Sequence, residues 1–236
     1  MRIATSNDNK ISVVIAALNE APRIANVLKV VENHPLIDEV IVVNDGSTDN
    51  TSGVVKKFNV KLIENEKNIG KTLSVKKGIQ AAKNKLIMLL DADLVGLSHQ
   101  SIDDLAEPVL NGEVDWTISL RDNSLRMMRL LKIDWISGER VIPKELLLDP
   151  LIWSRPEIGF GLETLMNKSL LQRGKTFRAV RLKNVINTRK SDKVGLLKGT
   201  FGDYWVVSQI SKVMPLYKFY MQFLTMAFLN KKYSRL

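Results

Sequence analysis

The first 95 residues alternate short apolar runs with amphipathic segments. Runs rich in Val, Ile and Leu predict buried strands, and they occupy residues 11–18, 39–45, 60–65 and 85–94. The segments between them predict helices, and they occupy residues 20–34, 46–58 and 70–83. Because the strands are apolar throughout and alternate with helices, the pattern predicts an α/β fold with a mostly parallel sheet covered on both faces.

The pattern is looser in the second half. We expect helices over residues 101–112, 124–136 and 159–174, and strands over 114–120 and within 175–186. The chain of 236 residues suits one sizeable domain. We expect a single domain over 1–212, with a nucleotide-binding half at 1–95 and an acceptor-side half at 96–212.

A tail over residues 213–236 differs from the rest. Residues 213–230 are mostly apolar with five aromatic side chains, and Lys231, Lys232 and Arg235 follow. This pattern favours a helix that packs on its own domain, on a partner or subunit in a homo-oligomer, or in a membrane interface.

Charge is distributed unevenly. Residues 1–120 carry a net charge of −3 and residues 121–236 a net charge of +13. The basic half favours anionic partners such as phosphates or an anionic membrane surface. The chain has no cysteine, and its first residues lack the apolar centre of a signal peptide. We therefore expect a cytoplasmic location, with peripheral attachment to the cytoplasmic face of a membrane as a further alternative.

Polar residues follow three of the predicted strands directly. Asn19 and Glu20 follow the first, Asp45 the second, and Asp91 and Asp93 the fourth. Ligands of open α/β sheets bind at the carboxyl ends of the strands. Turn and capping residues explain part of this pattern. They do not explain Asp91 and Asp93, two close carboxylates that repel each other unless a cation lies between them.

An Asp-x-Asp segment at a strand end suits Mg²⁺ or Mn²⁺. Mg²⁺ takes one or two carboxylates together with substrate phosphates. A metal on two phosphates stabilises a nucleoside diphosphate as leaving group.

At this point the chain resembles family 2 glycosyltransferases. The resemblance rests on "VVIAALNE", "EVIVVNDGSTDNT" and "NIGKTLSVKKGIQAAKNKLIMLLDADL", in the order and spacing of that family. It implies a GT-A fold and transfer of a sugar from a nucleotide-sugar donor. It also implies that Ala17, Asn19, Glu20, Asp45, Lys71 and Asp91 bind the donor, and that Asp93, with Asp91, binds the metal. Thr72 departs from the family pattern, which often has a second glycine there.

"ISGERVIPKELL" and "GFGLETLMNKSLLQRGKTFRAVRL" resemble segments of subgroups that include glucosyl-3-phosphoglycerate synthase-like and polyprenyl-phosphate sugar synthases. This resemblance implies that Gly138, Glu139 and Arg140 lie near the sugar or acceptor, and that Glu163 is catalytic, as acceptor ligand or base. The phosphoglycerate-type enzymes usually have a metal-binding His where this chain has Thr188 or Arg189. Arg189 and Lys190 are candidates to bind a phosphate instead.

Three functions remain open. The leading one is metal-dependent sugar transfer to a polyprenyl phosphate or another phosphorylated small molecule. A retaining transferase of the phosphoglycerate type and a non-catalytic anion- or membrane-binding module are the alternatives. A nucleotidyltransferase is disfavoured because "AALNEAPR" lacks the glycines of a triphosphate loop, and no motif for nucleic-acid binding is present.

Overall fold

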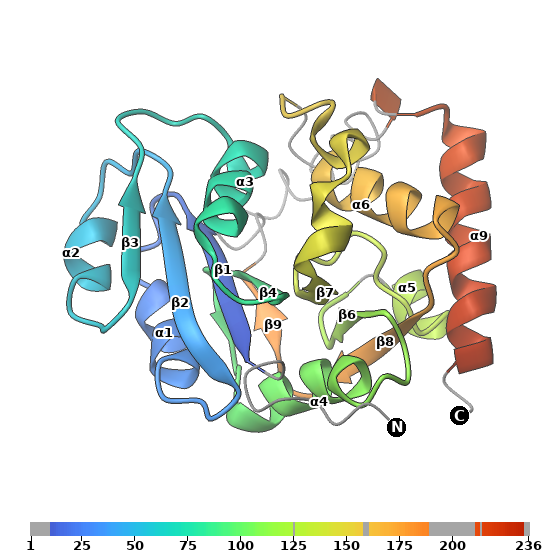
Figure 1. Cartoon of the computed structure of the whole chain (residues 1–236), viewed down its shortest axis with the longest axis horizontal. Coiled ribbons are helices and arrows are strands. Elements are labelled where there is room, and N and C mark those ends of the chain that lie inside the picture. Colours follow the sequence, from blue (N-terminus) through green and yellow to red (C-terminus); the bar gives the residue numbers. More distant parts are fainter. Residues whose placement is uncertain (1–9, 125, 158–160, 189–210, 213, 234–236) are drawn as a thin grey trace.

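The computed structural model describes residues 10–124, 126–157, 161–188, 211–212 and 214–233. A seven-stranded sheet runs through the molecule in the order β3-β2-β1-β4-β7-β6-β8 (Figure 1). Neighbouring strands are parallel except where β7 pairs antiparallel with β4 and β6. The predicted α/β class with a mostly parallel sheet is confirmed.

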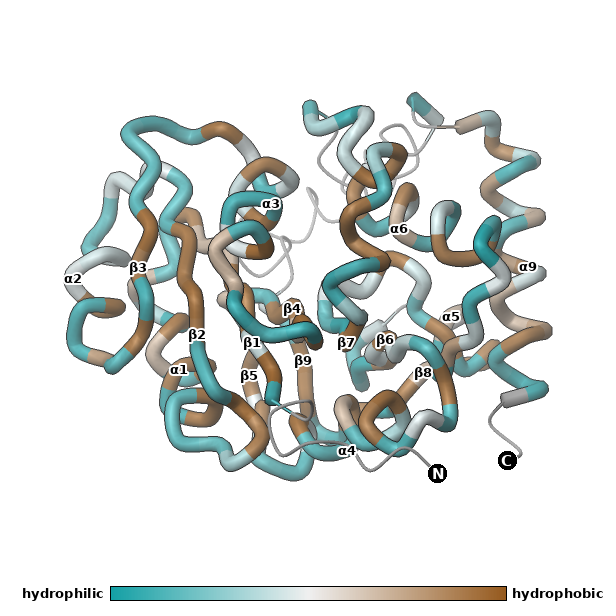
Figure 2. The backbone as a smooth tube through the Cα atoms, in the orientation of Figure 1, coloured by the Kyte–Doolittle hydropathy of each residue, from teal (hydrophilic) through white to brown (hydrophobic). Residues whose placement is uncertain are grey.

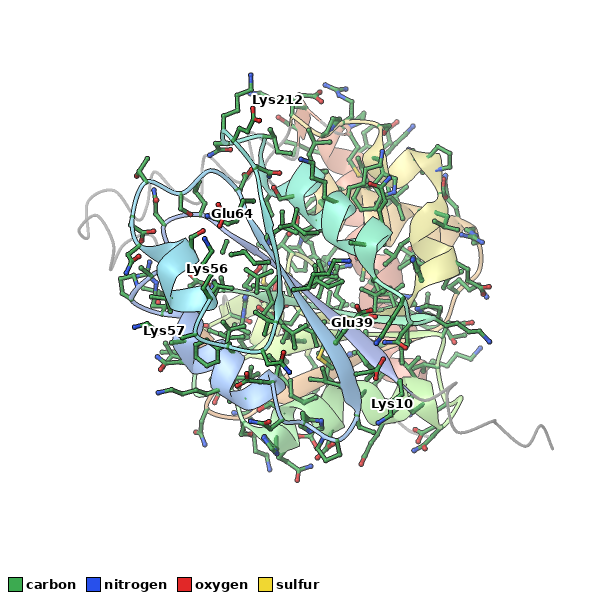
Figure 3. All side chains as sticks on the ribbon, turned by 60° about the vertical axis from the view of Figure 1, so that its left-hand side comes forward. Lys10, Glu39, Lys56, Lys57, Glu64 and Lys212 are labelled. Atoms are coloured by element: carbon green, nitrogen blue, oxygen red, sulfur yellow. The ribbon has the colours of Figure 1, made fainter. Side chains whose placement is uncertain are left out.

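The first half follows the predicted alternation. Its strands are β1 (Ile11–Ala17), β2 (Ile37–Asn44), β3 (Lys61–Glu64) and β4 (Leu86–Asp91), and its helices are α1 (Ile24–Val31), α2 (Thr51–Val55) and α3 (Lys71–Ala81). The edge strand β3 carries the exposed Lys61 and Glu64, and Lys56 and Lys57 lie nearby at the end of α2 (Figure 3). Charges on an edge strand oppose pairing with another chain.

Helices cover both faces of the sheet because its strands are apolar on both sides (Figure 2). Val14 and Val43 belong to a buried cluster that includes residues of α3. Val13 and Val42 point to the opposite face, in a cluster that includes residues of α1 and α4 (His99–Leu110). Alternation of neighbouring residues between the two clusters is what a strand's period of two dictates.

The second half departs from prediction in two places. Its main elements are β6 (Trp116–Arg121), α5 (Arg126–Leu130), β7 (Arg140–Pro143), α6 (Gly161–Gln172) and β8 (Phe177–Leu182), with short 3₁₀ turns at Lys144–Leu148 and Pro150–Trp153. The predicted helix over 124–136 was wrong in length, since Lys132 has a φ of 56° and turns the chain back into the core. The four-residue strand β7 was not predicted.

A two-stranded sheet links the end of β4 to the end of β8. β5 (Leu94–Val95) pairs antiparallel with β9 (Ile186–Asn187). This pairing holds the segment after Asp93 against the segment that precedes Thr188.

Helix α9 (Leu216–Tyr233) lies at the edge of the molecule beside α6 and β8 (Figure 1). Phe219 and Phe223 pack on Trp135, with ring centroids 5.7 and 4.0 Å apart. The side chain of Asn230 accepts from the Ala179 amide and donates to the Lys132 carbonyl, both at 2.8 Å. The tail thus packs on its own domain with one face. Within the described part of the chain, no helix is long and apolar enough to cross a bilayer.

We expect Asn230→Ala to lower the free energy of unfolding by about 1–3 kcal/mol, because two backbone groups lose their buried partner. Urea unfolding measures this change. Lys231→Ala, an exposed substitution on the same helix, is the control and should lie within about 0.5 kcal/mol of the parent chain. Equal stability of the two variants would contradict the role given to Asn230.

Candidate active site

The loops after β1 and β2 hold each other in place. Asn19 adopts a left-handed conformation with a φ of 57°, and its Oδ1 accepts from the Thr48 amide at 2.8 Å. The Asp45 amide donates to the carbonyl of the buried Ala17 at 2.8 Å. Glu20 forms an ion pair with Arg23 at 2.6 Å. Ala17, Asn19 and Glu20 therefore lie together at the carboxyl ends of these strands, as predicted from their positions after β1.

Asp45 organises the loop that leads into α3. Its Oδ1 accepts from the Ile69 amide at 2.9 Å and from Asn65 Nδ2 at 3.0 Å, and its Oδ2 accepts from the Gly70 amide at 3.0 Å. Gly70 has a φ of 93°, which favours glycine. These bonds set the position at which α3 begins, and so the position of Lys71. The hydrogen bond from Asp45 to a base remains a prediction.

Lys71 joins two elements that are far apart in the sequence. Its Nζ lies 2.9 Å from Asp91 Oδ1 and 3.0 Å from Glu163 Oε1. Burial acts to lower the pKa of Lys71, but attraction by Asp91 and then Glu163 outweighs it and raises the pKa above its usual value. The two carboxylates keep the ammonium group charged, and the Lys71 side chain as a whole is 39% exposed.

Asp91, at the end of β4, lies among cations. Arg121 Nη1 lies 3.7 Å from its Oδ2, on the other side from Lys71. Burial raises the pKa of Asp91, but Lys71 and Arg121 outweigh that effect and hold the pKa below its usual value. A β-carbon at Gly138 would lie 2.7 Å from Asp91 Oδ1. Only glycine therefore lets the backbone just before β7 approach the carboxylate this closely.

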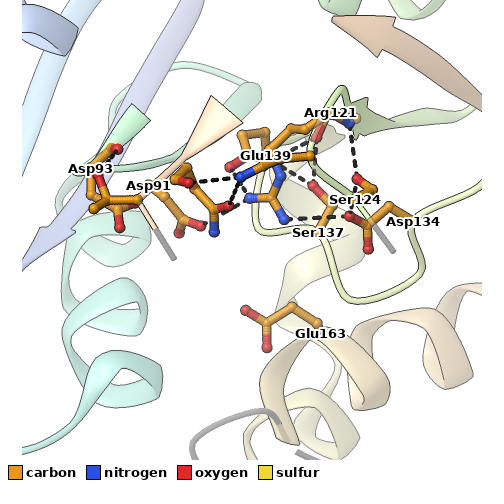
Figure 4. A network of polar contacts seen from close by, with 12 residues as sticks. Asp91, Asp93, Arg121, Ser124, Asp134, Ser137, Glu139 and Glu163 are labelled. Atoms are coloured by element: carbon orange, nitrogen blue, oxygen red, sulfur yellow. Dashed lines mark hydrogen bonds and ion pairs between the residues drawn. The ribbon is translucent and has the colours of Figure 1, made fainter. Parts of the chain in front are cut away.

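Arg121 is the centre of a buried polar network (Figure 4). It donates to Glu139 Oε1 at 2.9 Å and lies 3.4 Å from Asp134 Oδ2. Glu139 in turn accepts from Ser119 and Ser137 at 2.6 and 2.5 Å. Burial acts to lower the pKa of Arg121, but Glu139, Asp134 and Asp91 together raise it. Burial raises the pKa of Glu139, although Arg121 acts in the opposite direction.

Glu163, in the first turn of α6, faces this network (Figure 4). The residue is 2% exposed, and its Oε2 has no hydrogen-bond partner among the described residues. A buried carboxylate oxygen without a donor is costly. Because this oxygen is also closed to solvent, a ligand's donor group can reach it only after neighbouring side chains move.

Arg140 supports the wall of the site from inside. It is fully buried, donates to Asn167 Oδ1 at 2.6 Å and to the carbonyls of Ser137 and Trp135 at 2.9 and 3.1 Å. Burial lowers its pKa to about 10. The predicted contacts of Glu139 and Arg140 with sugar or acceptor remain predictions. In this structure both side chains are occupied by protein partners.

Asp93 is half-buried and lies beside Asp91, on the side away from Arg121 in Figure 4. Its carbonyl is 3.4 Å from the Thr188 hydroxyl. Arg189 and Lys190, the predicted phosphate-binding pair, fall outside the described residues.

The end of β4 carries two carboxylates, those of Asp91 and Asp93, and their binding of a divalent cation remains a prediction. Among the described residues no three His, Cys, Asp or Glu side chains are grouped as metal ligands. Asp91 and Asp93 supply two carboxylates, and Mg²⁺ uses one or two carboxylates with water and substrate phosphates. These two residues could hold Mg²⁺ or Mn²⁺ when a diphosphate completes the coordination.

The sequence interpretation missed Arg121 and the serines around Glu139. Arg121 directly follows the strand predicted over 114–120 and is the last residue of β6, a position at a strand end like that of Asp91. Asp134, however, follows the unexpected turn at Lys132, and no pattern indicates that it reaches Arg121.

Fold and site together define a three-layer α/β protein whose carboxylates and cations converge at the carboxyl ends of its strands. Residues 12–153, more than half of the chain, match the model of glycosyl transferase family 2. The chain belongs to that family, and the resemblance seen in the sequence is confirmed.

Known proteins similar to this chain fall in the same family or fold. A dolichyl-phosphate beta-glucosyltransferase of Trichomonas vaginalis is 35% identical over 94 residues, 34% of this chain and 28% of its own length. A dodecaprenyl-phosphate galacturonate synthase of Rhizobium johnstonii is 28% identical over 134 residues, 52% of this chain and 39% of its own length. This chain therefore matches less than half the length of each of these two relatives.

A solved structure shares the fold. Glucosyl-3-phosphoglycerate synthase from Mycobacterium tuberculosis, in complex with Mn²⁺, uridine diphosphate and glucosyl-3-phosphoglycerate, has a TM-score of 0.67 and 22% identity. The match covers 87% of this chain and 80% of that one. At this identity the likeness establishes the fold alone, which is the GT-A fold predicted above.

We expect Gly138→Ala to weaken metal-dependent binding of a nucleoside diphosphate at least tenfold, because the added carbon displaces the Asp91 carboxylate. Calorimetric titration measures the binding. Glu107→Ala, an exposed substitution on α4, is the control. Unchanged binding by Gly138→Ala would contradict the tight contact.

Proposed function

We propose that this chain transfers a sugar from a nucleoside-diphosphate sugar to a phosphate-bearing acceptor, with Mg²⁺ or Mn²⁺ as cofactor. The observation that carries the proposal is the convergence of Asp91, Lys71, Arg121 and Glu163 at one rim of the sheet. Membership of glycosyl transferase family 2 supports it.

The donor binds along the strand ends in this proposal. Ala17, Asn19, Glu20 and Asp45 line the nucleoside side, and Lys71 leaves its carboxylate partners to contact the diphosphate. Asp93, with Asp91, holds the metal, which acts as a Lewis acid on the departing diphosphate. Positive charge from Lys71 and Arg121 stabilises the negative charge that develops there.

Glu163 binds on the sugar and acceptor side. Its free Oε2 accepts a hydrogen bond from a sugar hydroxyl. In the transfer, the bond between the sugar and the diphosphate oxygen breaks, and a bond to the acceptor oxygen forms. A phosphate acceptor is ionised already and requires no base. If the acceptor is a hydroxyl, Glu163 takes its proton.

A polyprenyl phosphate is the acceptor class we favour. Two relatives carry a dolichyl or dodecaprenyl phosphate in their names, and the second half of this chain is strongly basic. A phosphoglycerate-type acceptor is the second candidate, on the likeness to the synthase of Mycobacterium tuberculosis. The basic second half of the chain would attract that negatively charged acceptor as well.

We expect one nucleotide sugar among UDP-, GDP-, ADP- and dTDP-sugars to raise the melting temperature by about 5–10 °C when present at about 100 times its Kd with Mn²⁺. Chelation should abolish the shift. Asp93→Asn should lose the metal-dependent part, whereas Asp104→Asn on the exposed side of α4 should keep it. A shift of equal size in chelator would overturn the metal role.

We expect Glu163→Gln to reduce transfer about 10- to 100-fold with a polyprenyl phosphate, through loss of one charged hydrogen bond, and about 10²–10⁴-fold with a hydroxyl acceptor. Donor binding should change little. Product formation with polyprenyl phosphate and with 3-phosphoglycerate measures both the rate and the acceptor class. Glu107→Gln, exposed on α4, is the control, and parental activity of Glu163→Gln would refute the assigned role.

A further inference from the structure

Helix α9 is apolar on two opposite faces. Its inner face is formed by Phe219, Phe223, Met226 and Asn230, all of them buried against the domain. A helix that packs only on its own domain should present polar residues to water on its opposite face.

The outer face is instead formed by large apolar side chains. The exposed fractions are 66% for Tyr217, 56% for Tyr220, 61% for Met221, 58% for Leu224 and 71% for Phe228. Spacings of three and four residues put all five on one side of the helix. A contiguous exposed patch of this kind marks an interaction site.

The charged residues of α9 itself have one sign. Lys218, Lys231 and Lys232 are exposed, and α9 contains no Asp or Glu. At helical spacing, Lys231 and Lys232 lie on either side of the line through Leu224 and Phe228. The helix therefore presents an apolar strip with cations at its borders.

A basic hollow adjoins the buried end of the helix at Asn230. It has a volume of about 650 Å³, and Arg129, Lys132 and Arg181 contribute to its wall. Asp122 neutralises Arg181 at 3.0 Å. Arg129 and Lys132 still give the wall of the hollow a surplus of positive charge. Leu130, 81% exposed, also contributes to its wall.

We propose that the outer face of α9 docks the protein on an anionic lipid bilayer. The aromatic and aliphatic side chains enter the interface, where Tyr is favoured. The lysines at the borders of this face contact lipid phosphates. A second copy of the chain fits less well, because a two-fold interface would set this cationic, acid-free helix against itself.

The docking deepens the proposed function, since a bound bilayer would present a polyprenyl phosphate to the site, and that link rests on the proposed function. The docking itself can be tested without turnover. A nucleotide-induced thermal shift measured on the same variants then separates failure of docking from failure of the transferase proposal.

The experiment is co-sedimentation of the full chain with phosphatidylcholine vesicles, with and without phosphatidylglycerol, at low and high salt. We expect binding only with phosphatidylglycerol and weakening by salt. The double variant Leu224→Ser/Phe228→Ser should bind at least tenfold more weakly. Leu148→Ser is the control, because Leu148 is 67% exposed on a different element.

Charge is tested in the same assay. Lys231→Gln/Lys232→Gln should lose about 25-fold in affinity, at roughly fivefold for each lysine. Lys57→Gln, on the β3 side of the molecule (Figure 3), should bind as the parent does. Parental binding by both double variants, or no binding by the parent chain, would overturn the proposal. A dimer in light scattering that the Leu224→Ser/Phe228→Ser variant dissociates would also overturn it, in favour of a second copy.

Discussion

The two ion pairs of Lys71 hold the candidate site together. One ammonium group lies within 3.0 Å of a carboxylate at the end of β4 and of another at the start of α6. Arg121 approaches Asp91 from the other side and is itself held by Glu139 and Asp134. Without these cations, the half-buried Asp91 and the buried Glu163 would be two like charges in a poorly solvated site, which is unfavourable. Because Lys71 is held by ion pairs, its anionic partner can be exchanged: a diphosphate can take the place of a carboxylate beside its ammonium group.

The parallel half of the fold could be predicted because its strands are apolar throughout and its helices have a clear period. The same pattern placed Asp45 and Asp91 correctly at strand ends, and the family resemblance came from these segments. β7 could not be predicted, since four residues carry too little periodicity. The need for glycine at position 138 arises from its close contact with the Asp91 carboxylate, which is distant in sequence. The length of α5 was mistaken because the apolar residues of 124–136 fit a helix, whereas Lys132 turns and buries Ile133 and Trp135.

The roles of Asp45 and Arg140 illustrate a further limit of sequence reasoning. Both were assigned to ligands through the family resemblance, and both are engaged by protein atoms in the structure. Asp45 fixes the loop that delivers Lys71, and Arg140 braces the segment that contains Ser137. Such indirect roles depend on contacts between distant segments, which residue type and spacing do not reveal. The tail was easier to interpret, since its apolar pattern predicted packing on its own domain among other choices, and α9 does pack there.

The central claim is that the end of β4 holds a divalent cation together with a nucleoside diphosphate. Electron paramagnetic resonance of Mn²⁺ tests it directly, because the signal of free Mn²⁺ falls when the ion is bound. In the protein alone, Lys71 and Arg121 already neutralise Asp91, so the account predicts little binding of Mn²⁺ until the matching nucleoside diphosphate is added. Tight binding of Mn²⁺ without any nucleotide, or no binding with UDP, GDP, ADP and dTDP in turn, would contradict the account.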